Sequence, residues 1–457
     1  MPRVTIVGGG ISGLSTAYYL ARRGIGSTVV ESRPRLGGVI QTERVEGCVI
    51  EAGPDSFLSI KPAAMDLIRE LGLAGEVIGS NDHLRKTWVR KRGRLVPLPD
   101  GLMMMVPTRI MPLVTSPLLS WSTKIRMGLE WFRAPAPRAE DESVAEFVRE
   151  HYGQEAVDYL AEPLLSGIYG GDPESLSVRA VLPRFVDLST RYGSLTRGVL
   201  AGRKTARKEA GSLPLFRTLK GGLGQLVEAT VKAAAPHLLW MPGRAEAVER
   251  SGTGFRLRVN GGWVKSEHLA LACEAHAAAP LGATLDARLG ELLGGVAYSS
   301  SMTVALGFEE RAFPHPLPGF GFLIPKRERK RLIACTWVGT KFPCRVPPGI
   351  ALLRCFLGGS NDAAVLGESD DRVVEGVVAE LREIVRFDSR PLFARVFRWP
   401  RSMAQYTVGH PARMAEIEQR LARVAGLHLA GNAYEGIGVP DCIRMGKAAA
   451  ERIAADL

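Results

Sequence analysis

The chain has 457 residues, too many for a single hydrophobic core, so we expect two or three domains. Hydrophobic residues make up 46% of the chain and charged residues 23%, a balance that excludes a disordered protein, a collagen-like repeat and a coiled coil. The net charge of +12 favours an anionic small molecule or an acidic membrane surface as partner. Because the basic residues are spread along the chain and are not interleaved with aromatic residues, we expect no nucleic-acid partner.

The sequence predicts neither a membrane-spanning helix nor a secretory signal. Its longest stretch without Asp, Glu, Lys or Arg is 292–308, which has 17 residues and contains consecutive glycines and serines, whereas a spanning helix needs about 20 apolar residues. The six cysteines are scattered without a CxxC pair, and the eight histidines are dispersed. We therefore expect a protein of the reducing cytoplasm that binds no metal.

The first predicted elements are a strand at 4–7, a glycine-rich turn at 8–13 and a helix. A second apolar run, 28–30, ends at Glu31, which lies 18 residues after Gly13. Strand, glycine turn, helix, strand and acid in this order are typical of a dinucleotide-binding fold, in which about 20 residues separate the glycines from the acid.

Each residue of this motif has a physical role. Gly8 permits the tight turn, Gly10 lets the backbone approach the pyrophosphate, and Gly13 lets the helix pack closely on the sheet. The N–H groups and the positive dipole end at the start of the helix attract the phosphates, and Glu31 accepts hydrogen bonds from the ribose hydroxyls. The motif predicts a Rossmann-type domain that binds NAD or FAD; a glycine-rich turn without a ligand is the alternative.

A helical insert is predicted between residues 100 and 204. Ser143 and Glu146 have the spacing of a capping box, which marks the start of a helix. The stretches 101–106 and 113–121 are unusually apolar. They form either the core of the insert or a patch that rests on a membrane surface.

Strands dominate the next part of the chain. Residues 245–248 and 255–259 predict a hairpin with its turn at 251–254. Residues from 292 to 390 alternate in strand fashion and predict a second, mixed sheet. The fold class is therefore α/β, with a Rossmann-type domain, a mixed-sheet domain for the substrate and a helical insert.

Motifs beyond the first strand–helix–strand unit distinguish between NAD and FAD. They are Arg-Leu-Gly-Gly at 35–38, Glu-Ala-Gly-Pro-Asp-Ser at 51–56, and the C-terminal stretches 427–432 and 435–441. The combination resembles the FAD-binding fold of the amine-oxidase and porphyrinogen-oxidase superfamily, in which the end of the chain returns to cover the flavin. The resemblance implies noncovalently bound FAD, with the positive end of a last helix near Pro440 lying against the flavin.

Further motifs narrow the resemblance. Stretches that resemble the oxygen-dependent porphyrinogen oxidases of haem synthesis are 166–172, 319–325, 397–400, 405–410 and 431–436. Stretches that are similar to the bacterial coproporphyrinogen III oxidase branch are 334–337, 341–343 and 439–443. The protoporphyrinogen branch carries an Arg at the position of Thr87, and we expect the neighbouring Lys86 to point to the other face of its strand.

The resemblance implies an FAD-dependent oxidase that converts coproporphyrinogen III to coproporphyrin III, with O2 as the acceptor. A protoporphyrinogen IX oxidase is the first alternative, and an amine oxidase or a carotenoid desaturase on the same fold is the second. A non-enzymatic basic module that binds nucleic acid or membrane is the third. No catalytic residue is assigned, because hydride passes to the flavin and no His–Asp or paired-carboxylate pattern is apparent; His410 is expected to be structural.

The resemblance also implies the residues of the site. The cofactor-binding residues are Gly8, Gly9, Gly10, Ile11, Ser12, Gly13, Glu31, Ser32, Arg35, Gly37, Gly38, Val39, Gly53, Pro54, Asp55, Ser56, Ala245, Trp399, Gly431, Asn432, Val439, Pro440 and Asp441. The residues that line the substrate pocket are Gly167, Phe320, Leu323, Trp337 and Phe356, with Lys341, Arg345 and Arg354 as candidate cations. Ordinary core packing is the alternative for each aromatic residue.

The domains implied in this way are discontinuous. The FAD-binding domain comprises 1–79, 205–275 and 391–457, and the substrate-binding domain comprises 80–99 and 276–390. The helical insert spans 100–204 and is the candidate for membrane-surface contact. We expect a cytoplasmic protein that is peripheral to the membrane if the insert binds there.

Overall fold

The computed structural model describes residues 3–137, 140–206, 213–313, 317–360 and 362–457. The chain divides into two compact units. Unit 1 comprises Met1–Ser80, Leu215–Ala297 and Pro411–Leu457, and unit 2 comprises Asn81–Pro214 and Tyr298–His410. Because each unit is assembled from segments that are distant in sequence, its stability depends on long-range packing.

The predicted domain boundaries need three main corrections. Residues 276–297 belong to unit 1 and not to the substrate domain, and residues 391–410 belong to unit 2 and not to the FAD-binding domain. The insert 100–204 is part of unit 2 and not a separate unit. The second error arises because β21 (Phe393–Gln405) pairs with β17 (Ala297–Glu309), a long-range pairing that the local sequence pattern does not encode.

Unit 1 is built on a parallel sheet. Its strands, in spatial order, are β12 (Leu238–Pro242), β2 (Ser27–Glu31), β1 (Val4–Val7), β16 (His268–Leu271) and β22 (Leu427–Leu429). Each neighbouring pair is parallel, so all of these strands end at one edge of the sheet. The strand order reverses between β1 and β16, and open sheets of this kind bind ligands at such a point.

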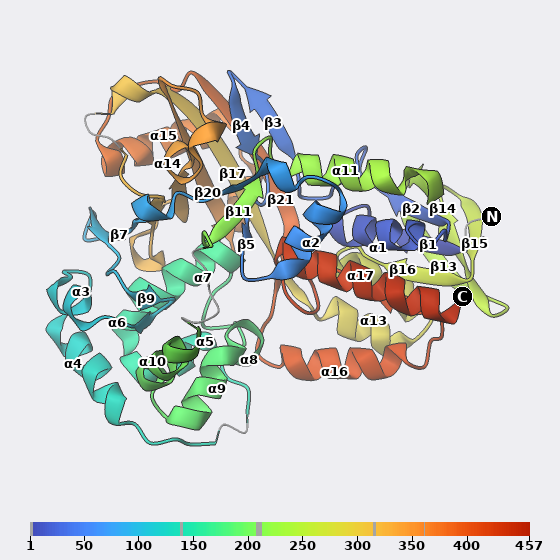
Figure 1. Ribbon diagram of the computed structural model, residues 1–457, viewed down its shortest axis with the longest axis horizontal. Coiled ribbons are helices and arrows are strands. Elements are labelled where there is room, and N and C mark those ends of the chain that lie inside the picture. The colour runs from blue at the N-terminus through green and yellow to red at the C-terminus, as the bar shows by residue number, and fades with distance from the viewer. Residues whose placement is uncertain (1–2, 138–139, 207–212, 314–316, 361) are drawn as a thin grey trace. The chain divides into compact units, whose positions relative to one another are not determined.

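Helices cover this sheet closely. Helix α1 (Ile11–Ala21) packs between α11 (Gly224–Ala234) and α17 (Val439–Asp456), and Figure 1 shows the three helices side by side. Every residue of α1 from Ile11 to Leu20 is buried, as expected of a helix surrounded by a sheet and other helices. The predicted strand, helix and second strand of the N-terminal motif are confirmed.

Three small antiparallel sheets complete unit 1. They are formed by β3 (Thr42–Val45) and β4 (Cys48–Glu51); by β5 (Phe57–Leu58), β11 (Phe216–Leu219) and β6 (Val77–Gly79); and by β13 (Ala245–Ser251), β14 (Gly254–Val259) and β15 (Gly262–Ser266). The hairpin predicted between 245 and 259 is confirmed as β13 and β14, but the sequence analysis missed β15. Further helices are α2 (Pro62–Glu70), α12 (Ala275–Ala283), α13 (Ala287–Gly294) and α16 (His410–Leu421).

Unit 2 is built on the predicted mixed sheet. Its strands, in spatial order, are β21, β17, β20 (Ile350–Gly359), β19 (Ala334–Trp337), β18 (Gly321–Leu323), β7 (Thr87–Lys91) and β8 (Arg94–Pro97). Strands β18 and β7 are parallel, whereas β17, β20, β19 and β18 are antiparallel in turn. One face packs against α15 (Asp370–Val385), and side chains such as Val304, Phe322 and Leu353 form the core beneath this helix.

Residues 110–206 form most of the helices of unit 2. They include α3 (Ile110–Thr115), α4 (Trp121–Leu129), α5 (Val144–Tyr152), α7 (Glu162–Tyr169), α9 (Pro183–Tyr192) and α10 (Leu195–Ala206). The predicted capping box is confirmed, because Glu146 N donates to Ser143 Oγ at 3.1 Å and Ser143 N donates to the Glu146 carboxylate at 3.0 Å. Among the described residues, no helix has both the length and the apolar character needed to cross a membrane.

Candidate functional site

The loops at the carboxyl edge of the parallel sheet contain the predicted glycines. Gly8 follows β1 and donates its N–H to Val30 O at 2.8 Å. Its φ is +107°, and a Cβ atom there would lie 2.7 Å from the backbone of Ala272. Gly13 is equally constrained, because a Cβ atom would lie 2.0 Å from Gly8 O. Only glycine fits at these two positions, so α1 begins directly against the end of the sheet.

The start of α1 offers backbone donors to a ligand. Gly10 is the N-cap residue, and no side chain caps the helix there. The first N–H groups of a helix have no partner within the helix, and they lie at the positive end of its dipole. The predicted residues Ile11 and Ser12 are in this first turn and are buried. This geometry suits a pyrophosphate group.

Glu31 organises the loops beside the helix start. Its carboxylate accepts hydrogen bonds from Gly9 N at 2.7 Å, Arg33 N at 2.8 Å and Ser32 Oγ at 3.3 Å. Its backbone carbonyl accepts a bond from Gly243 N at 2.8 Å, two residues before the predicted Ala245. A carboxylate has about four acceptor positions, so Glu31 can hold these loops and still accept a hydrogen bond from a ribose hydroxyl.

Arg35 holds the following loop by bonds to its own backbone. Its guanidinium donates to Gly38 O at 2.6 Å, Ile40 O at 3.0 Å and Leu36 O at 3.3 Å. Burial lowers the pKa of this guanidinium from its ordinary value. Gly37 N donates to Gly9 O at 2.8 Å, so the loop lies against the glycine turn. The side chain of Arg35 thus positions the cofactor loop, a role the sequence analysis did not assign to it.

The next predicted stretch, 53–56, is held in the same unit. A Cβ atom at Gly53 would lie 2.0 Å from the carbonyl oxygen of Val39, so this position also requires glycine. Ser56 Oγ donates to Asp55 at 2.6 Å. The predicted residues Val39 and Gly53 are therefore neighbours in space although they are separated in sequence.

The C-terminal stretch returns to the same edge of the sheet, as predicted. Ala430 N donates to Leu271 O at 3.1 Å, which brings Gly431 and Asn432 beside the end of β16. Helix α17 then begins at Val439, with Pro440 in its first turn. Its first turn is fixed by Asp441, which accepts hydrogen bonds from Gly438 N at 3.2 Å and from Lys61 Nζ at 2.6 Å.

Lys61 was not predicted as part of this site. It precedes Pro62, the first residue of α2, and nothing in its local sequence indicates a partner 380 residues away. The predicted cofactor residues described above thus lie at or near the carboxyl edge of the parallel sheet, in loops, at the end of β2 and in the first turns of α1 and α17. Three features of this edge fit a dinucleotide such as FAD. They are the N–H groups at the start of α1 that have no partner within the helix, the glycine positions at which an added Cβ would clash with backbone atoms, and the Glu31 carboxylate.

The face of the unit 2 sheet opposite α15 carries two rows of cross-strand neighbours. Leu323, Ala334, Phe356 and Thr303 are paired in register across β18, β19, β20 and β17. Gly167 of α7 lies against this row, because a Cβ atom there would meet Leu323 Cδ2 at 3.2 Å. The predicted residues Gly167, Leu323 and Phe356 therefore share one face of the sheet.

The second row contains two threonines, a glycine and an arginine. It comprises Thr87, Gly321, Thr336 and Arg354, paired in register across β7, β18, β19 and β20. The buried guanidinium of Arg354 lies over the ring of Phe356, 4.7 Å from its centroid. Lys86 Nζ lies over the Trp88 ring on the opposite face, which confirms that Lys86 and Thr87 point in different directions.

Trp337, also predicted as a pocket residue, lies on the other face of the sheet. Alternation along β19 places it beside Cys335, in the core beneath α15 and 6.2 Å from the ring of Phe322. For Trp337 the pocket prediction is therefore wrong, and the alternative of core packing is correct. Phe320 precedes β18 and is buried, with its N–H donated to Lys86 O at 2.8 Å.

Two further candidate cations lie near one aromatic ring. Lys341 ends α14 (Val338–Lys341), and Arg345 ends the short 3-10 helix that follows. Both are buried, at 5.2 Å and 5.3 Å from the centroid of the Phe342 ring. Trp399, predicted as a cofactor contact, lies on β21 and is therefore in unit 2 rather than with the other predicted cofactor residues.

Comparison with curated proteins finds relatives that match along nearly the whole chain. Coproporphyrinogen III oxidase of Bacillus subtilis (strain 168) is 34% identical and matches 98% of this chain and 96% of its own length. Coproporphyrinogen III oxidase of Staphylococcus aureus is 30% identical and matches 99% of each chain. Protoporphyrinogen oxidase 2 of Arabidopsis thaliana is 26% identical and matches 99% of this chain and 93% of its own length.

Solved structures and family models agree with these relatives. A structure from Exiguobacterium sp. 255-15, provisionally assigned as a protoporphyrinogen oxidase, is 30% identical and covers 100% of this chain and 99% of its own, with a TM-score of 0.88. A putrescine oxidase variant has a TM-score of 0.73 at 17% identity, covers 99% of each chain and shares the fold. Residues 11–454 match the model of the flavin containing amine oxidoreductases. The chain therefore belongs to the flavin containing amine oxidoreductase family.

Proposed function

We propose that this protein is an FAD-dependent oxidase that converts coproporphyrinogen III to coproporphyrin III with O2 as the electron acceptor. Relatives named coproporphyrinogen III oxidase, similar over their full length, support the substrate class. The structural observation that carries the proposal is the face of the unit 2 sheet opposite α15. There an apolar row that includes Leu323 and Phe356 adjoins the buried guanidinium of Arg354.

This face suits the chemistry of a porphyrinogen. The macrocycle is broad and apolar and carries carboxylates at its rim, so it needs an apolar surface bordered by cations. Coproporphyrinogen III has four propionates, whereas protoporphyrinogen IX has two. Arg354, beside Phe356 on this face, is the cation that favours the substrate with more carboxylates. Lys341 and Arg345 lie beside Phe342 instead.

The flavin, when bound, would accept the hydride of a carbon–hydrogen bond, that is, the hydrogen together with the electron pair of the bond. A pyrrole N–H of the substrate would release the accompanying proton, and O2 would take up the two electrons and two protons as hydrogen peroxide. The residues of this chain bind and orient. The start of α1 holds the pyrophosphate, Glu31 holds the ribose, and the positive end of α17 favours negative charge beside it. We propose no catalytic residue. The protein's contribution is to hold the macrocycle on a surface that excludes water, and no titrating side chain is required for this.

We further propose that FAD is bound noncovalently. Cys442 lies on α17 near the predicted flavin site, but it is buried and burial raises the pKa of its thiol to about 11. Burial also raises the pKa of Cys273, beside the end of β16, to about 12. Because the thiolate is the reactive form, neither cysteine is suited to form a covalent link. Acid precipitation is expected to release all of the flavin into the supernatant.

A surface of unit 2 supports contact with a membrane. Exposed apolar side chains on α3, α4 and the turn that follows form a group that we call the α3–α4 patch: Ile110, Met111, Trp121, Ile125, Leu129 and Phe132. Trp121, Ile125 and Leu129 recur every fourth residue and so lie on one side of α4. By contrast, Met105, Val106, Leu113, Leu118 and Leu119 are buried, which supports core packing for most of the two predicted apolar stretches. We propose that the patch rests on an anionic membrane surface.

Anaerobic mixing tests the reaction class. The purified protein is expected to be yellow, which excludes a non-enzymatic basic module, and coproporphyrinogen III is expected to bleach its flavin absorbance within the mixing experiment. Admission of O2 is expected to restore the absorbance. Bleaching by a primary amine but not by coproporphyrinogen III would instead support an amine oxidase.

A further inference from the structure

Two histidines and an aspartate meet in unit 1 at the end of the sheet opposite the cofactor loops. His268 is the first residue of β16, His428 lies in β22, and Asp456 is the last residue of α17. His268 pairs in register with Val4 at the start of β1, whereas the cofactor loop follows Val7 at the other end of that strand. Asp456 ends a helix of 18 residues, so it lies roughly 25 Å from the helix start at the cofactor loops.

The fold explains why these residues meet. Ala270 of β16 pairs with His428 of the parallel neighbour β22. His268 is two residues from Ala270, so its side chain lies on the same face of the sheet as that of His428. Helix α17 packs against β22. Asp456 follows the fully buried Ile453 by three residues, which directs it to the side of the helix that meets the sheet.

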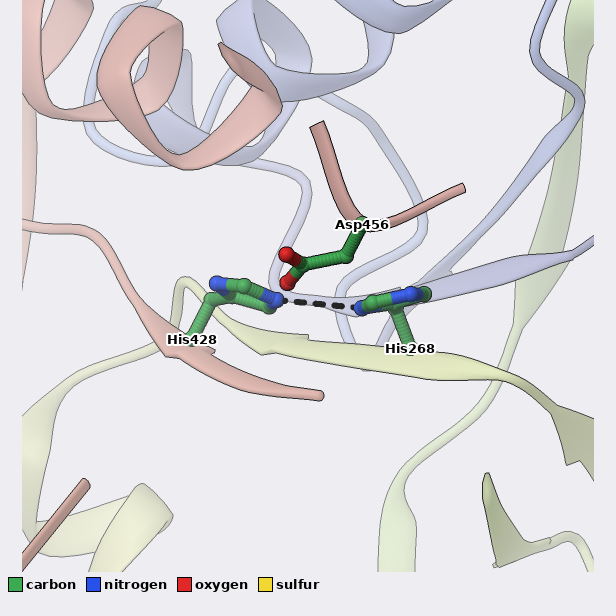
Figure 2. Close-up of side chains that lie close together, drawn as sticks. All are labelled: His268, His428 and Asp456. Atoms are coloured by element: carbon green, nitrogen blue, oxygen red, sulfur yellow. Dashed lines mark hydrogen bonds between the residues drawn. The ribbon is translucent and has the colours of Figure 1, made fainter. Parts of the chain in front are cut away.

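The distances among the three side chains suit a metal ion. His268 Nδ1 and His428 Nε2 are 3.2 Å apart, and the three ligand atoms, including a carboxylate oxygen of Asp456, lie within 4.8 Å of one another. Figure 2 shows the two rings facing each other through these nitrogens, with the carboxylate beside the line that joins them. A tetrahedral zinc ion with bonds of about 2.0–2.1 Å holds its ligand atoms about 3.3 Å apart. The two nitrogens already have this spacing. Asp456 is exposed, so its carboxylate can move closer to the two nitrogens.

The charged side chains that act on the two rings are Asp456, Glu267, Arg3 and Arg452. Asp456 supplies the negative charge of the cluster. Arg452 opposes a cation there, and so does Arg3, although Arg3 is paired with Glu267 through bonds of 2.9 Å and 2.7 Å.

We propose that His268, His428 and Asp456 form a binding site for a divalent first-row transition metal ion of the zinc class, with water as a further ligand. Two imidazoles, one carboxylate and a water molecule are a common ligand set for such ions. The sequence pattern indicated no metal, because the histidines are dispersed and no CxxC pair is present. The metal would join the end of α17 to the sheet and would stabilise unit 1 by binding only the folded form.

The alternative is a simple hydrogen bond between the two neutral rings. One histidine would then donate to the other, and the arrangement would need no metal. A metal competes with the proton of that hydrogen bond, so the two interpretations predict different responses to added zinc. The distance from the cofactor loops means that neither interpretation depends on the proposed oxidase function.

Zinc titration of the full, flavin-loaded protein tests the proposal. Chelator-treated protein is titrated with Zn²⁺ against a chromophoric zinc chelator, with the exposed Cys344 blocked to prevent binding there. We expect one equivalent to bind and the melting temperature to rise. Co²⁺ in place of Zn²⁺ is expected to give the visible absorption bands of a tetrahedral site. Failure to bind an equivalent of either ion would overturn the proposal.

Asp456→Asn is the main variant, because an exposed residue at a helix end can be changed without loss of the fold. We expect its affinity for Zn²⁺ to fall at least about tenfold and its zinc-induced rise in melting temperature to disappear, with the flavin content unchanged. His428→Gln is expected to abolish binding, but it alters a buried position. His83→Ala removes an exposed histidine of unit 2 and is the matched control, expected to bind as the unaltered protein does. Equal affinity in Asp456→Asn and His83→Ala would contradict the proposed ligand set.

Discussion

Glu31 shows how one side chain serves both the fold and the ligand. Its carboxylate accepts hydrogen bonds from the N–H groups of Gly9 and Arg33 and is 7% exposed, so little of its surface is left for solvent. The same carboxylate is placed at the end of β2, where a dinucleotide ribose binds in this type of fold. Changes at this position therefore act on the cofactor loops and on the cofactor together.

Glu31→Gln is expected to weaken FAD binding without unfolding unit 1. The substitution keeps the size of the side chain but replaces a charged acceptor by a neutral amide, which costs about 1.5–3 kcal/mol. This corresponds to a rise in the Kd for FAD of roughly 10- to 150-fold. Reconstitution of the apoprotein, followed by flavin fluorescence, gives the Kd. Glu451→Gln, an exposed change on α17, is the control, and an identical Kd in both variants would contradict the assignment of Glu31.

Glu130 and His151 form a buried polar cluster in unit 2. Glu130 accepts hydrogen bonds from His151 Nδ1 at 3.1 Å and Ser194 Oγ at 2.7 Å, and also from Leu195 N. Burial alone would raise the pKa of Glu130, but the bonds from His151, Ser194 and Leu195 outweigh it and hold the pKa below its ordinary value. Because the folded state lowers this pKa, the ionised carboxylate stabilises the protein above the ordinary pKa of glutamate, and this stability is lost as the pH falls through the lowered value.

Glu130→Gln is therefore expected to be less stable than the unaltered protein at pH 7, by about 1.5–3 kcal/mol. The difference in the free energy of unfolding between the two proteins is expected to narrow below the ordinary glutamate pKa of about 4.3. There Glu130 of the unaltered protein becomes protonated, and the stabilisation by its charge is lost. Urea unfolding at pH 7 and pH 4 measures both values. Glu174→Gln, at an exposed position of unit 2, is the control. A difference that stays constant with pH would show that the charge of Glu130 does not contribute.

At the scale of elements, the contact between α1 and the parallel sheet determines the geometry of the cofactor loops. Gly13→Ala is expected to displace α1, because the added Cβ would lie 2.0 Å from Gly8 O. We expect a loss of about 1–3 kcal/mol in stability and a lower flavin content, measured by thermal unfolding and by absorbance. Gly75→Ala, where a Cβ would meet no atom within 4 Å, is the control. Normal flavin content in Gly13→Ala would contradict this role of the close contact.

Elements defined by local pattern were predictable from the sequence. The strand 4–7, its glycine turn and the helix after it follow from periodicity and glycine spacing, and the start of α5 follows from the Ser143–Glu146 spacing. Pairings between distant segments were not predictable. β21 joins β17, Trp337 turns into the core beneath α15, and Lys61 reaches Asp441, and no local signal marks any of these contacts.

The same limit explains what was missed in the candidate sites. His268 and His428 come together only because β16 and β22 are neighbours, and they are 160 residues apart in sequence. The exposed stripe of α4 lies mostly outside the apolar stretches 101–106 and 113–121, because a helix presents an apolar side through every fourth residue rather than through consecutive ones.

At the scale of the whole molecule, the α3–α4 patch predicts that the protein binds to anionic lipid vesicles. We expect it to sediment with vesicles of phosphatidylglycerol and to bind weakly to vesicles of phosphatidylcholine. Replacing Trp121 and Phe132 together by serine is expected to reduce the bound fraction several-fold, because both side chains are exposed and apolar. Leu239→Ser, at an exposed apolar position of unit 1, is the control. Unchanged binding by the double variant would contradict a role for the patch.

The substrate itself is tested most directly by the ratio of two specificity constants. Steady-state fluorescence of porphyrin formation gives kcat/KM for coproporphyrinogen III and for protoporphyrinogen IX under the same conditions. A carboxylate that gains a cation forms a charge-assisted hydrogen bond worth about 1.5–3 kcal/mol, and coproporphyrinogen III has two more carboxylates that can pair with a cation such as Arg354 on the sheet face opposite α15. We therefore expect its kcat/KM to be at least about tenfold higher, a ratio equivalent to about 1.4 kcal/mol. An equal ratio would contradict the account, and a reversed ratio would identify protoporphyrinogen IX as the preferred substrate.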